Sequence, residues 1–320
     1  MFSDAQYELA KVISKLPIDV RNRHTSYEDL LSLTHDQRFC VTFEEGCATW
    51  VRDVKCSTKH TSDIINLAKT TLFAVKTCKK HHKERLPIIR QTWAKAALNI
   101  EYFSEVVNKK YQTRVLPEVY KNTEKGHCQK TEGILKYFNK NANMKGWKWL
   151  VIVDDDTILG VQKMLSLLEC YDPKDTIVIG QRYGFMLSEE RIGYDFLGGG
   201  AGMVFSRGMV TEILKDNGKQ CTCPKPEEHD DMYFTGVCVA SLKGSIIHSD
   251  QFHQNSPSDY APELLQHQDP ISFHKFEHID EEFGILVSTN PLETYDKYFR
   301  DSDEYLRNYK HNKGKHDDEL

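Results

Sequence analysis

Long hydrophobic runs and an excess of positive charge are both missing from this 320-residue sequence. Its uncharged apolar runs, such as residues 149–153, are far shorter than the roughly 20 residues that a membrane-spanning helix needs, so we expect no transmembrane segment. The formal net charge of −5 provides no global field to attract nucleic acid, and we expect no nucleic-acid partner. With 39% apolar and 28% charged residues, the chain can bury a core and is not predicted to be disordered.

Cysteine, in contrast, is plentiful. The sequence has nine cysteines, a number that is typical of an oxidising compartment, and the odd count leaves at least one thiol free or paired outside the chain. Cys221 and Cys223 resemble half of a metal site, but no second closely spaced pair accompanies them. Disulfide or buried-thiol roles are therefore favoured, and the spacing does not give the connectivity.

The two ends of the sequence point to different compartments. The first twenty residues carry charges where a signal peptide would have its apolar core. The last four residues, Asp317 to Leu320, read DDEL and are close to the retrieval signals KDEL and HDEL of the endoplasmic reticulum. Because such a signal acts only in the secretory lumen, we expect a soluble protein of that lumen, a retrieval receptor as partner, and a signal peptide upstream of the given start. A cytosolic protein with an acidic end by chance is the alternative.

Strand-like and helix-like patterns alternate from residue 70 onward. Short apolar runs at 72–75, 149–153 and 176–179 predict buried strands, and one-sided apolar patterns predict helices over 130–138, 161–170, 209–215 and 230–242. Ser206 can cap the third of these helices. This alternation predicts an α/β fold with a mostly parallel central sheet flanked by helices. We divide the chain into an N-terminal segment (1–69) that ends or follows a preceding domain, an α/β domain (70–290) and a polar C-terminal tail (291–320).

Three adjacent acids, Asp154, Asp155 and Asp156, follow the strand predicted at 149–153. Ligands of open α/β sheets bind at the carboxyl ends of strands, so this cluster lies where a ligand is expected. A divalent cation would relieve the mutual repulsion, and carboxylate oxygens suit Mg²⁺ or Mn²⁺, which in turn could neutralise a diphosphate leaving group. The alternative is an acidic turn that caps the next helix.

A glycine run, Gly198-Gly199-Gly200, leads into an apolar strand. Glycine allows backbone N–H groups to approach a substrate closely. The run lacks the GKS or GKT ending of a phosphate-binding loop, and it precedes a strand instead of opening a helix, which weakens ATP and nicotinamide interpretations. Taken alone, a tight turn or a bulged sheet edge is an equal alternative.

Two further patterns could supply chemistry. Asp230 and Asp231 begin a predicted helix, where a carboxylate is stabilised by the helix dipole and caps the helix, but one of them could instead deprotonate a hydroxyl. His248 and His253 follow an apolar run at 245–247, and a histidine there could complete the metal shell. The basic stretch 76–90 could bind phosphate or form a solvated loop.

Together these motifs resemble the glycosyltransferase family of Fringe, core 1 galactosyltransferase and the β-1,3-galactosyl- and N-acetylglucosaminyltransferases. The resemblance covers roughly residues 72–280. The matching motifs, in family order, are Arg85 with Arg90-Gln91-Thr92-Trp93, Lys130-Thr131, Val153-Asp154-Asp155-Asp156-Thr157, the segment 198–207 and Asp230-Asp231-Met232. The resemblance implies a GT-A (Rossmann-like) fold. It is strongest to the branch that moves glucose onto O-linked fucose of thrombospondin type 1 repeats, whose segments FAVKTCKKHH, GHCQKTEGIL and HQDPISFHKF are similar here.

The resemblance also implies a function and roles. The chain would be an inverting, metal-dependent enzyme that transfers glucose from UDP-glucose in β-1,3 linkage to that fucose, with O-fucosylated repeat proteins as partners. Asp156 and His253 would bind Mn²⁺ (or Mg²⁺), with His248 as the second candidate; Asp231 would be the catalytic base, with Asp230 as the alternative. Cofactor-binding roles would fall to Asp154, Asp155, Arg85, Arg90, Gly198, Gly199 and Gly200.

Two other functions remain open at this point. One is a Fringe-like or galactosyl enzyme with another donor or acceptor, because a few hydrogen bonds decide which sugar a pocket accepts. The other is a non-catalytic sugar-binding protein of the endoplasmic reticulum, which the retention of every acid disfavours.

Overall fold

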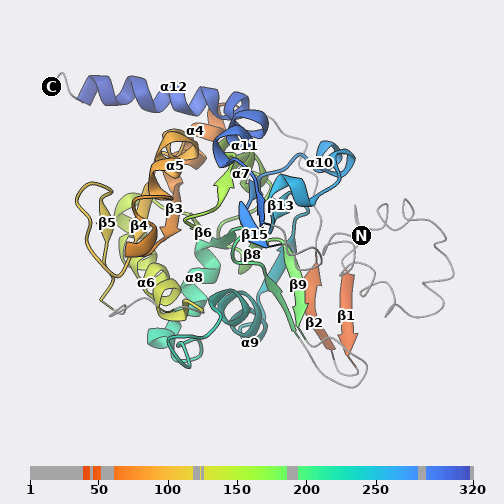
Figure 1. The fold of residues 1–320 in the computed structure, drawn as a ribbon. Coiled ribbons are helices and arrows are strands. Elements are labelled where there is room, and N and C mark those ends of the chain that lie inside the picture. The colour runs from red at the N-terminus through yellow and green to blue at the C-terminus, as the bar shows by residue number, and fades with distance from the viewer. Residues whose placement is uncertain are drawn as a thin grey trace.

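The computed structural model describes residues 39–43, 46–51, 61–117, 123, 126–185, 194–279 and 286–317 (Figure 1). Most of the predicted N-terminal segment, and residues 318–320 of the DDEL end, lie outside these residues. Strands β1 (Phe39–Phe43) and β2 (Gly46–Val51) pair antiparallel. Across the described part of the chain, none of the helices combines the length and the apolar character needed to cross a bilayer.

A seven-stranded sheet forms the centre of the fold. Its order is β12-β8-β11-β6-β3-β4-β5, and β11 is the only strand of this sheet that runs antiparallel to its neighbours. The strands are β3 (Thr71–Lys76), β4 (Ile100–Phe103), β5 (Thr113–Arg114), β6 (Trp149–Asp154), β8 (Ile177–Gly180), β11 (Met203–Ser206) and β12 (Ser245–His248). The predicted α/β class with a mostly parallel sheet is therefore confirmed, as are the strands expected at 72–75, 149–153 and 176–179.

The two faces of the sheet bury two separate apolar clusters because side chains alternate along each strand. On β3, Phe73 and Val75 pack into one cluster, whereas Leu72 and Ala74 pack into the other. Helices α4 (Thr61–Thr70), α5 (Leu86–Gln91) and α7 (Val161–Leu168) cover the first face. Helices α6 (Cys128–Lys145), α8 (Arg207–Ile213) and α9 (Val239–Ser241) cover the second (Figure 1). Each face of the sheet is thereby closed to water.

Most of the predicted helices form at the expected places. The Ser206 side chain accepts a hydrogen bond from the backbone N–H of Met209, so the predicted cap of α8 is confirmed. The helix expected over 230–242 instead begins as a π-helical segment, Asp231–Cys238, which α9 continues. A disulfide between Cys128 and Cys223 ties the first residue of α6 to the loop before that segment, which agrees with an oxidising compartment.

Smaller strands lie over the carboxyl edge of the main sheet. Strand β13 (Phe252–His253) pairs parallel with β14 (Ser272–Phe273), which pairs antiparallel with β7 (Ile158–Leu159). Two further antiparallel pairs are β9 (Arg182–Phe185) with β10 (Tyr194–Leu197), and β15 (Glu277–Ile279) with β16 (Leu286–Ser288). A short helix, α10 (Pro262–Gln268), lies between β13 and β14 in the chain. This arrangement brings the segment that follows β14 over the ends of β3 and β6.

The region expected to be a polar tail, 291–320, forms two helices as far as it is described. These are α11 (Pro291–Tyr298) and α12 (Arg300–Asp317), and they lie across the top of the view in Figure 1. Their sequence is polar, but Leu306 and Phe299 are buried in the same apolar cluster as α7. A few apolar residues in register are enough to dock a helix whose other face is solvated.

One buried carboxyl fixes this docking. Asp303 has no exposed surface; its Oδ1 accepts a hydrogen bond from the backbone N–H of Gln162 at the start of α7, at 2.9 Å, and its Oδ2 accepts one from the Tyr295 hydroxyl at 3.0 Å. Burial raises the pKa of Asp303 to about 6, although these hydrogen bonds favour the ionised form.

The raised pKa of Asp303 predicts a pH-dependent stability. Because the folded protein binds this proton more tightly than the unfolded chain, the contribution of Asp303 is greatest below about pH 4 and falls as the pH rises through about 6. Asp303→Asn removes the titrating group. We expect the stability of this variant relative to the wild type to rise by on the order of 1–3 kcal/mol between pH 4 and pH 7, measured by urea denaturation. A difference that is constant over this range would contradict the assignment.

Candidate active site

Acidic side chains from two distant segments meet at the carboxyl ends of β3 and β6. These strands are parallel neighbours, and Lys76, the last residue of β3, lies opposite Asp154, the last residue of β6. Asp155 and Asp156 follow directly, and the first residues of the π-helical segment place Asp230 and Asp231 beside them. Five carboxylates therefore gather at the edge of the sheet where ligands of α/β proteins bind.

Three of the residues at this edge form a candidate metal site. Ligand atoms of Asp154, Asp156 and His274 all lie within 4.8 Å of one another, and His274 Nε2 is 3.1 Å from Asp156 Oδ1. His274 follows β14, and its Nδ1–H donates to the backbone oxygen of Gln254 at 3.1 Å, which orients the ring. Burial raises the pKa of Asp156, but His274 and Arg85 outweigh it and hold the pKa well below its usual range, so the carboxylate is ionised.

Two carboxylate oxygens and one imidazole nitrogen fit a Mn²⁺ or Mg²⁺ ion. Such ions accept oxygen ligands and commonly keep further positions for water or substrate phosphate. The second nitrogen of His274 already has a backbone partner, as ligating histidines usually do. We assign Asp154, Asp156 and His274 as the residues that would hold the metal.

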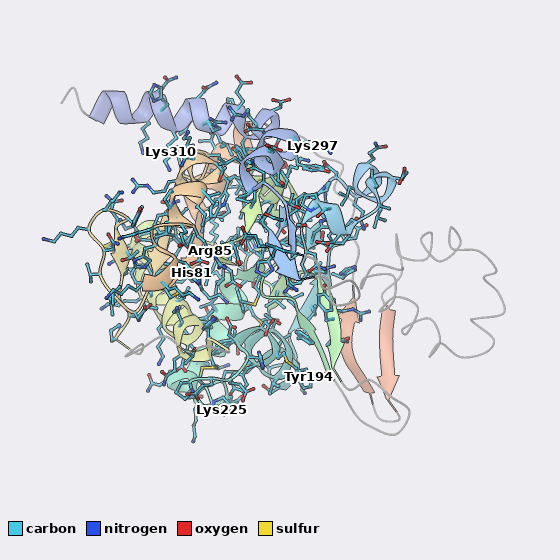
Figure 2. All side chains as sticks on the ribbon, in the orientation of Figure 1. His81, Arg85, Tyr194, Lys225, Lys297 and Lys310 are labelled. Atoms are coloured by element: carbon cyan, nitrogen blue, oxygen red, sulfur yellow. A yellow bond between two sulfur atoms is a disulfide. The ribbon has the colours of Figure 1, made fainter. Side chains whose placement is uncertain are left out.

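Protein cations neutralise the rest of the acidic cluster. Arg85 Nη1 lies 2.7 Å from Asp155 Oδ1 and 2.9 Å from Asp156 Oδ2, near the middle of the molecule in Figure 2. The Thr77 hydroxyl donates to Asp155 Oδ2 at 2.6 Å. Burial still raises the pKa of Asp155 despite these partners. Asp155 therefore ties the ends of β3 and β6 together, while Asp154 and Asp156 face the candidate metal position.

The two acids of the second pair have different environments. Asp230 Oδ2 accepts from Lys76 Nζ at 2.6 Å and from the Thr131 hydroxyl at 2.5 Å. Burial raises its pKa, but the Lys76 ammonium outweighs burial and holds the pKa at about 2. The pKa of Asp231 is raised instead, first by burial and then by the charge of Asp230. Asp230 is thus a fixed anion, and Asp231 is the better proton acceptor.

Lys76 connects the two groups of acids. Its Nζ lies 3.2 Å from Asp154 Oδ1 and 2.6 Å from Asp230 Oδ2, and the residue is only 5% exposed. Burial lowers its pKa, but the charges of Asp154 and Asp230 raise it overall, so the ammonium stays charged. The ion pairs of Lys76 fix the distance between the candidate metal site and the Asp230–Asp231 pair.

The glycine run lies between those two groups. The backbone N–H of Gly199 donates to Asp231 Oδ2 at 3.1 Å, and a Cβ built on Gly200 would lie only 2.4 Å from ring atoms of His274. A Cβ on Gly198 would lie 2.8 Å from both Gln254 Oε1 and the Tyr183 ring. Any larger residue at Gly200 would displace His274, so the run gives the backbone its close approach to the site.

Neither histidine chosen from the sequence reaches the acids. His253 is 1% exposed, and its two ring nitrogens bond to Gln251 O at 3.1 Å and Gln268 Oε1 at 2.9 Å. His248 Nδ1 accepts from the backbone N–H of Arg182 at 3.2 Å. We therefore replace His253 with His274 as the candidate ligand. The sequence offers two Phe-His pairs, at 252–253 and 273–274, and only the fold distinguishes them.

Arg90 is also not at the acidic cluster. Its Nη1 donates to the backbone oxygen of Lys110 at 2.7 Å, and the residue lines a cavity between β4 and α12. Arg85 and Arg90 lie about one and a half helical turns apart on the chain, so their side chains leave α5 and its preceding turn in different directions. Of the two arginines, Arg85 alone touches the predicted site residues.

The sequence analysis placed Lys76 and Thr77 in a possible phosphate-binding stretch and Thr131 in a family motif, but it did not predict that these residues contact the acids. All three are buried, and Lys130 Nζ adds a further bond to the backbone oxygen of Thr77 at 2.8 Å. A signal was present in the sequence, because a lysine that ends an apolar strand and a Lys-Thr pair that begins a helix are both polar residues at buried positions.

The edge of the mostly parallel sheet brings together three candidate metal ligands, an ionised carboxylate and a second carboxylate whose pKa is raised. These features define a candidate metal-dependent enzyme. The Fringe-like family model matches residues 67–305, and the chain belongs to this family. Family membership agrees with the GT-A glycosyltransferase fold that the sequence motifs indicated.

Three curated relatives illustrate the similarity. The chain is 41% identical over 236 residues to the Beta-1,3-glucosyltransferase of Mus musculus and 41% identical over 239 residues to that of Homo sapiens. These matches cover 71% and 74% of this chain but only 46% and 44% of the relatives. It is 24% identical over 254 residues to the Fringe glycosyltransferase of Drosophila melanogaster, covering 69% of this chain and 59% of the relative. The chain spans less than half the length of the two glucosyltransferases it matches.

The choice of His274 over His253 can be tested by metal binding alone. We expect His274→Ala to weaken Mn²⁺ affinity at least about tenfold, because even residues that only orient a ligand cost 10–100-fold. His253→Ala is the matched control; it should lower stability by opening a buried cavity but leave Mn²⁺ affinity near the wild-type value. Isothermal titration calorimetry of Mn²⁺ into each purified protein measures the affinities of the two variants and the wild type. A loss of affinity in His253→Ala alone would restore the sequence-based choice.

Proposed function

We propose that this chain is an inverting, metal-dependent glycosyltransferase that moves glucose from UDP-glucose in β-1,3 linkage onto O-linked fucose of thrombospondin type 1 repeats. The observation that carries the proposal is the meeting of Asp154, Asp156 and His274 with Asp231 across the glycine run, in a chain of the Fringe-like family. The 41% identity to proteins named Beta-1,3-glucosyltransferase supports glucose as the donor sugar.

The donor end of this reaction would be held by the acidic cluster and Arg85. A metal held by Asp154, Asp156 and His274 supplies positive charge that stabilises a diphosphate leaving group. Arg85 is in contact with Asp155 and Asp156 and 35% of its side chain is exposed, so one face of its guanidinium can reach a phosphate oxygen.

The acceptor end would depend on Asp231. Its Oδ1 accepts from the backbone N–H of Met232 at 2.8 Å and its Oδ2 from that of Gly199 at 3.1 Å, so both oxygens have fixed directions and keep a lone pair each. The raised pKa brings this carboxylate closer to the working pH, where it removes the proton from the attacking hydroxyl. The hydroxyl oxygen then forms the new bond at the anomeric carbon as the bond to UDP breaks on the opposite face.

Asp230 would act by position. Its hydrogen bonds to Lys76 and Thr131 keep it ionised, and its charge helps to raise the pKa of Asp231. This division of roles favours Asp231 over Asp230 as the base.

The compartment and partners form part of the same proposal. The lumen of the endoplasmic reticulum is supported by the Cys128–Cys223 disulfide, which an oxidising compartment maintains. A retrieval receptor that recognises Asp317 to Leu320, and O-fucosylated repeat proteins as acceptors, are the partners we propose.

Transfer assays with paired donors and acceptors test the proposal. Radiolabelled UDP-glucose, UDP-galactose and UDP-N-acetylglucosamine are offered with Mn²⁺ or EDTA to a folded thrombospondin repeat and to an EGF repeat, each carrying O-fucose. We expect Mn²⁺-dependent transfer of glucose to the thrombospondin repeat. N-acetylglucosamine transfer to the EGF repeat would favour the Fringe-like alternative, for which the 24% identity to Fringe glycosyltransferase is the supporting observation. Absence of transfer from every donor would favour a non-catalytic sugar-binding protein.

Substitutions at the two acids separate the base from the fixed anion. Asp231→Asn should lower kcat by about 10²–10⁴-fold, because the base is lost, and should leave UDP-glucose affinity and thermal stability near wild type. Asp230→Asn should instead lower the melting temperature, because it leaves the buried Lys76 ammonium with fewer partners, at a cost of about 3–5 kcal/mol. Kinetics, titration calorimetry and thermal unfolding measure these effects. Collapse of UDP-glucose affinity in Asp231→Asn would contradict the base assignment.

A further inference from the structure

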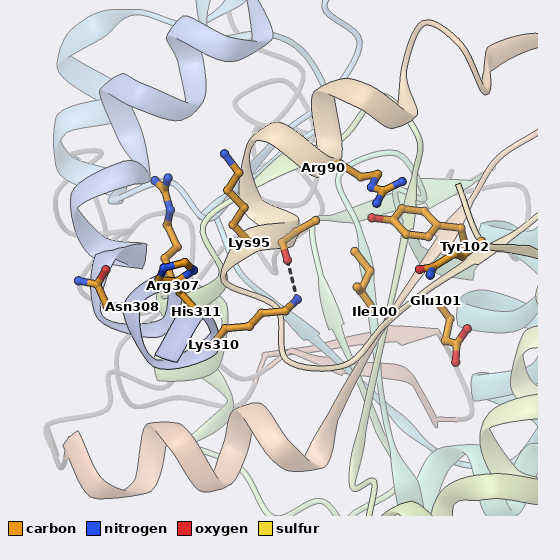
Figure 3. A pocket seen from close by; sticks show the side chains of 11 residues that line it. Arg90, Lys95, Ile100, Glu101, Tyr102, Arg307, Asn308, Lys310 and His311 are labelled. Atoms are coloured by element: carbon orange, nitrogen blue, oxygen red, sulfur yellow. Dashed lines mark hydrogen bonds between the residues drawn. The ribbon is translucent and has the colours of Figure 1, made fainter. Parts of the chain in front are cut away.

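A cavity of about 660 Å³ lies between β4 and α12, away from the acidic cluster. Figure 3 shows Arg307 and Lys310 of α12 on one side of it, facing Lys95, Arg90 and the β4 residues Ile100 and Tyr102. Its volume is within the range of about 300–1,000 Å³ that small-molecule sites occupy. The α12 residues that line it follow residue 305, where the match to the Fringe-like family model ends.

The cavity is strongly cationic in a chain whose net charge is −5. It is lined by four basic side chains, those of Arg90, Lys95, Arg307 and Lys310, and by His311. Its lining contains one carboxylate, that of Glu101. Glu101 already accepts from Arg114 at 3.2 Å and from the Tyr137 hydroxyl at 3.1 Å, so it does not neutralise the cavity. Among the described residues, no carboxylate lies within ion-pair distance of Arg90, Lys95 or Lys310.

Lys310 is fixed at the cavity wall by backbone atoms alone. Its Nζ donates to Ala94 O at 3.0 Å and to Ala97 O at 2.5 Å, and burial lowers its pKa. These bonds dock α12 and hold one ammonium group in place without an anion. A bound anion would lower the cost of keeping this charge partly buried.

The cavity also offers apolar surface and a neutral donor. Ile100 and Ala94 contribute apolar surface, and Tyr102 is 6% exposed, with burial raising its pKa to about 12 although the charge of Arg90 opposes this. Arg90 uses Nη1 on the backbone of Lys110, which leaves further guanidinium N–H groups for a ligand. Two arginines and two lysines line a pocket that is open to solvent on one side, and they suit the several oxygens of a phosphate group, which a guanidinium can bind in bidentate fashion.

We propose that the cavity between β4 and α12 is a second ligand site, which binds a small molecule that carries a phosphate or diphosphate group. The site involves neither the candidate metal ligands nor Asp231. Its volume of about 660 Å³, which is within the range of small-molecule sites, favours a small molecule over an extended acidic peptide.

Inorganic pyrophosphate is a suitable probe. It is titrated calorimetrically into the purified chain in EDTA and at constant ionic strength, so that no metal assists binding at the acidic cluster. We expect saturable binding, weakened at least tenfold by Arg90→Gln and by Lys95→Gln, whose side chains are exposed and whose removal opens no core. Lys297→Gln, an exposed lysine of α11 labelled in Figure 2, is the matched control and should bind as the wild type does.

Two further measurements keep the proposal falsifiable. Arg85→Gln should retain pyrophosphate binding; if binding is lost in Arg85→Gln but kept in Arg90→Gln and Lys95→Gln, the probe occupies the acidic cluster and the proposal is overturned. Absence of saturable binding to the wild type also overturns it. If a polyglutamate peptide binds through Arg90 and Lys95 while pyrophosphate does not, the surface recognises acidic peptides and the small-molecule assignment is wrong.

Discussion

The ion pairs of Lys76 are the interaction on which the rest of the site depends. Five carboxylates converge on the ends of two strands, and without cations among them their mutual repulsion would force the segments apart. Lys76 is 5% exposed, so its ammonium and the carboxylates of Asp154 and Asp230 interact with little screening by water. Removing either acid would leave the buried Lys76 ammonium poorly compensated. Because the cost of desolvating these charges offsets much of their attraction, such pairs contribute more to the geometry of the site than to net stability.

The same pairs create an asymmetry between neighbouring acids. Asp230 and Asp231 are adjacent in the chain, yet Lys76 and Thr131 lower the pKa of the first, and burial together with the first acid raises the pKa of the second. Similarly, Asp155 is held by Thr77 and Arg85 while Asp156 contacts His274. These aspartates thus differ in pKa and in the groups they contact, because their partners lie on β3, on α6 and after β14.

The C-terminal helices add a second level of organisation. Asp303 joins α12 to the start of α7, and Lys310 joins it to the backbone around Ala94 and Ala97. Both contacts are polar groups in poorly solvated positions, and they dock a helix whose sequence is otherwise hydrophilic. By docking α12 next to β4, they also create the cationic cavity. Composition indicated only a solvated tail, because mean polarity does not reveal which few side chains find buried partners.

Sequence patterns were sufficient to predict the α/β class, the buried strands at 72–75, 149–153 and 176–179, the cap at Ser206 and the family motifs. These are local patterns of polarity and spacing, and strand and helix periods can be read directly from the chain. The fold was needed to show that His274 and not His253 reaches the acids, that Arg85 and not Arg90 contacts them, and that Lys76 joins the two groups of acids. Those contacts link residues as far apart in the chain as 76 and 230. A sequence pattern does not give the spatial distance between such segments, because that distance depends on the sheet register that brings them together.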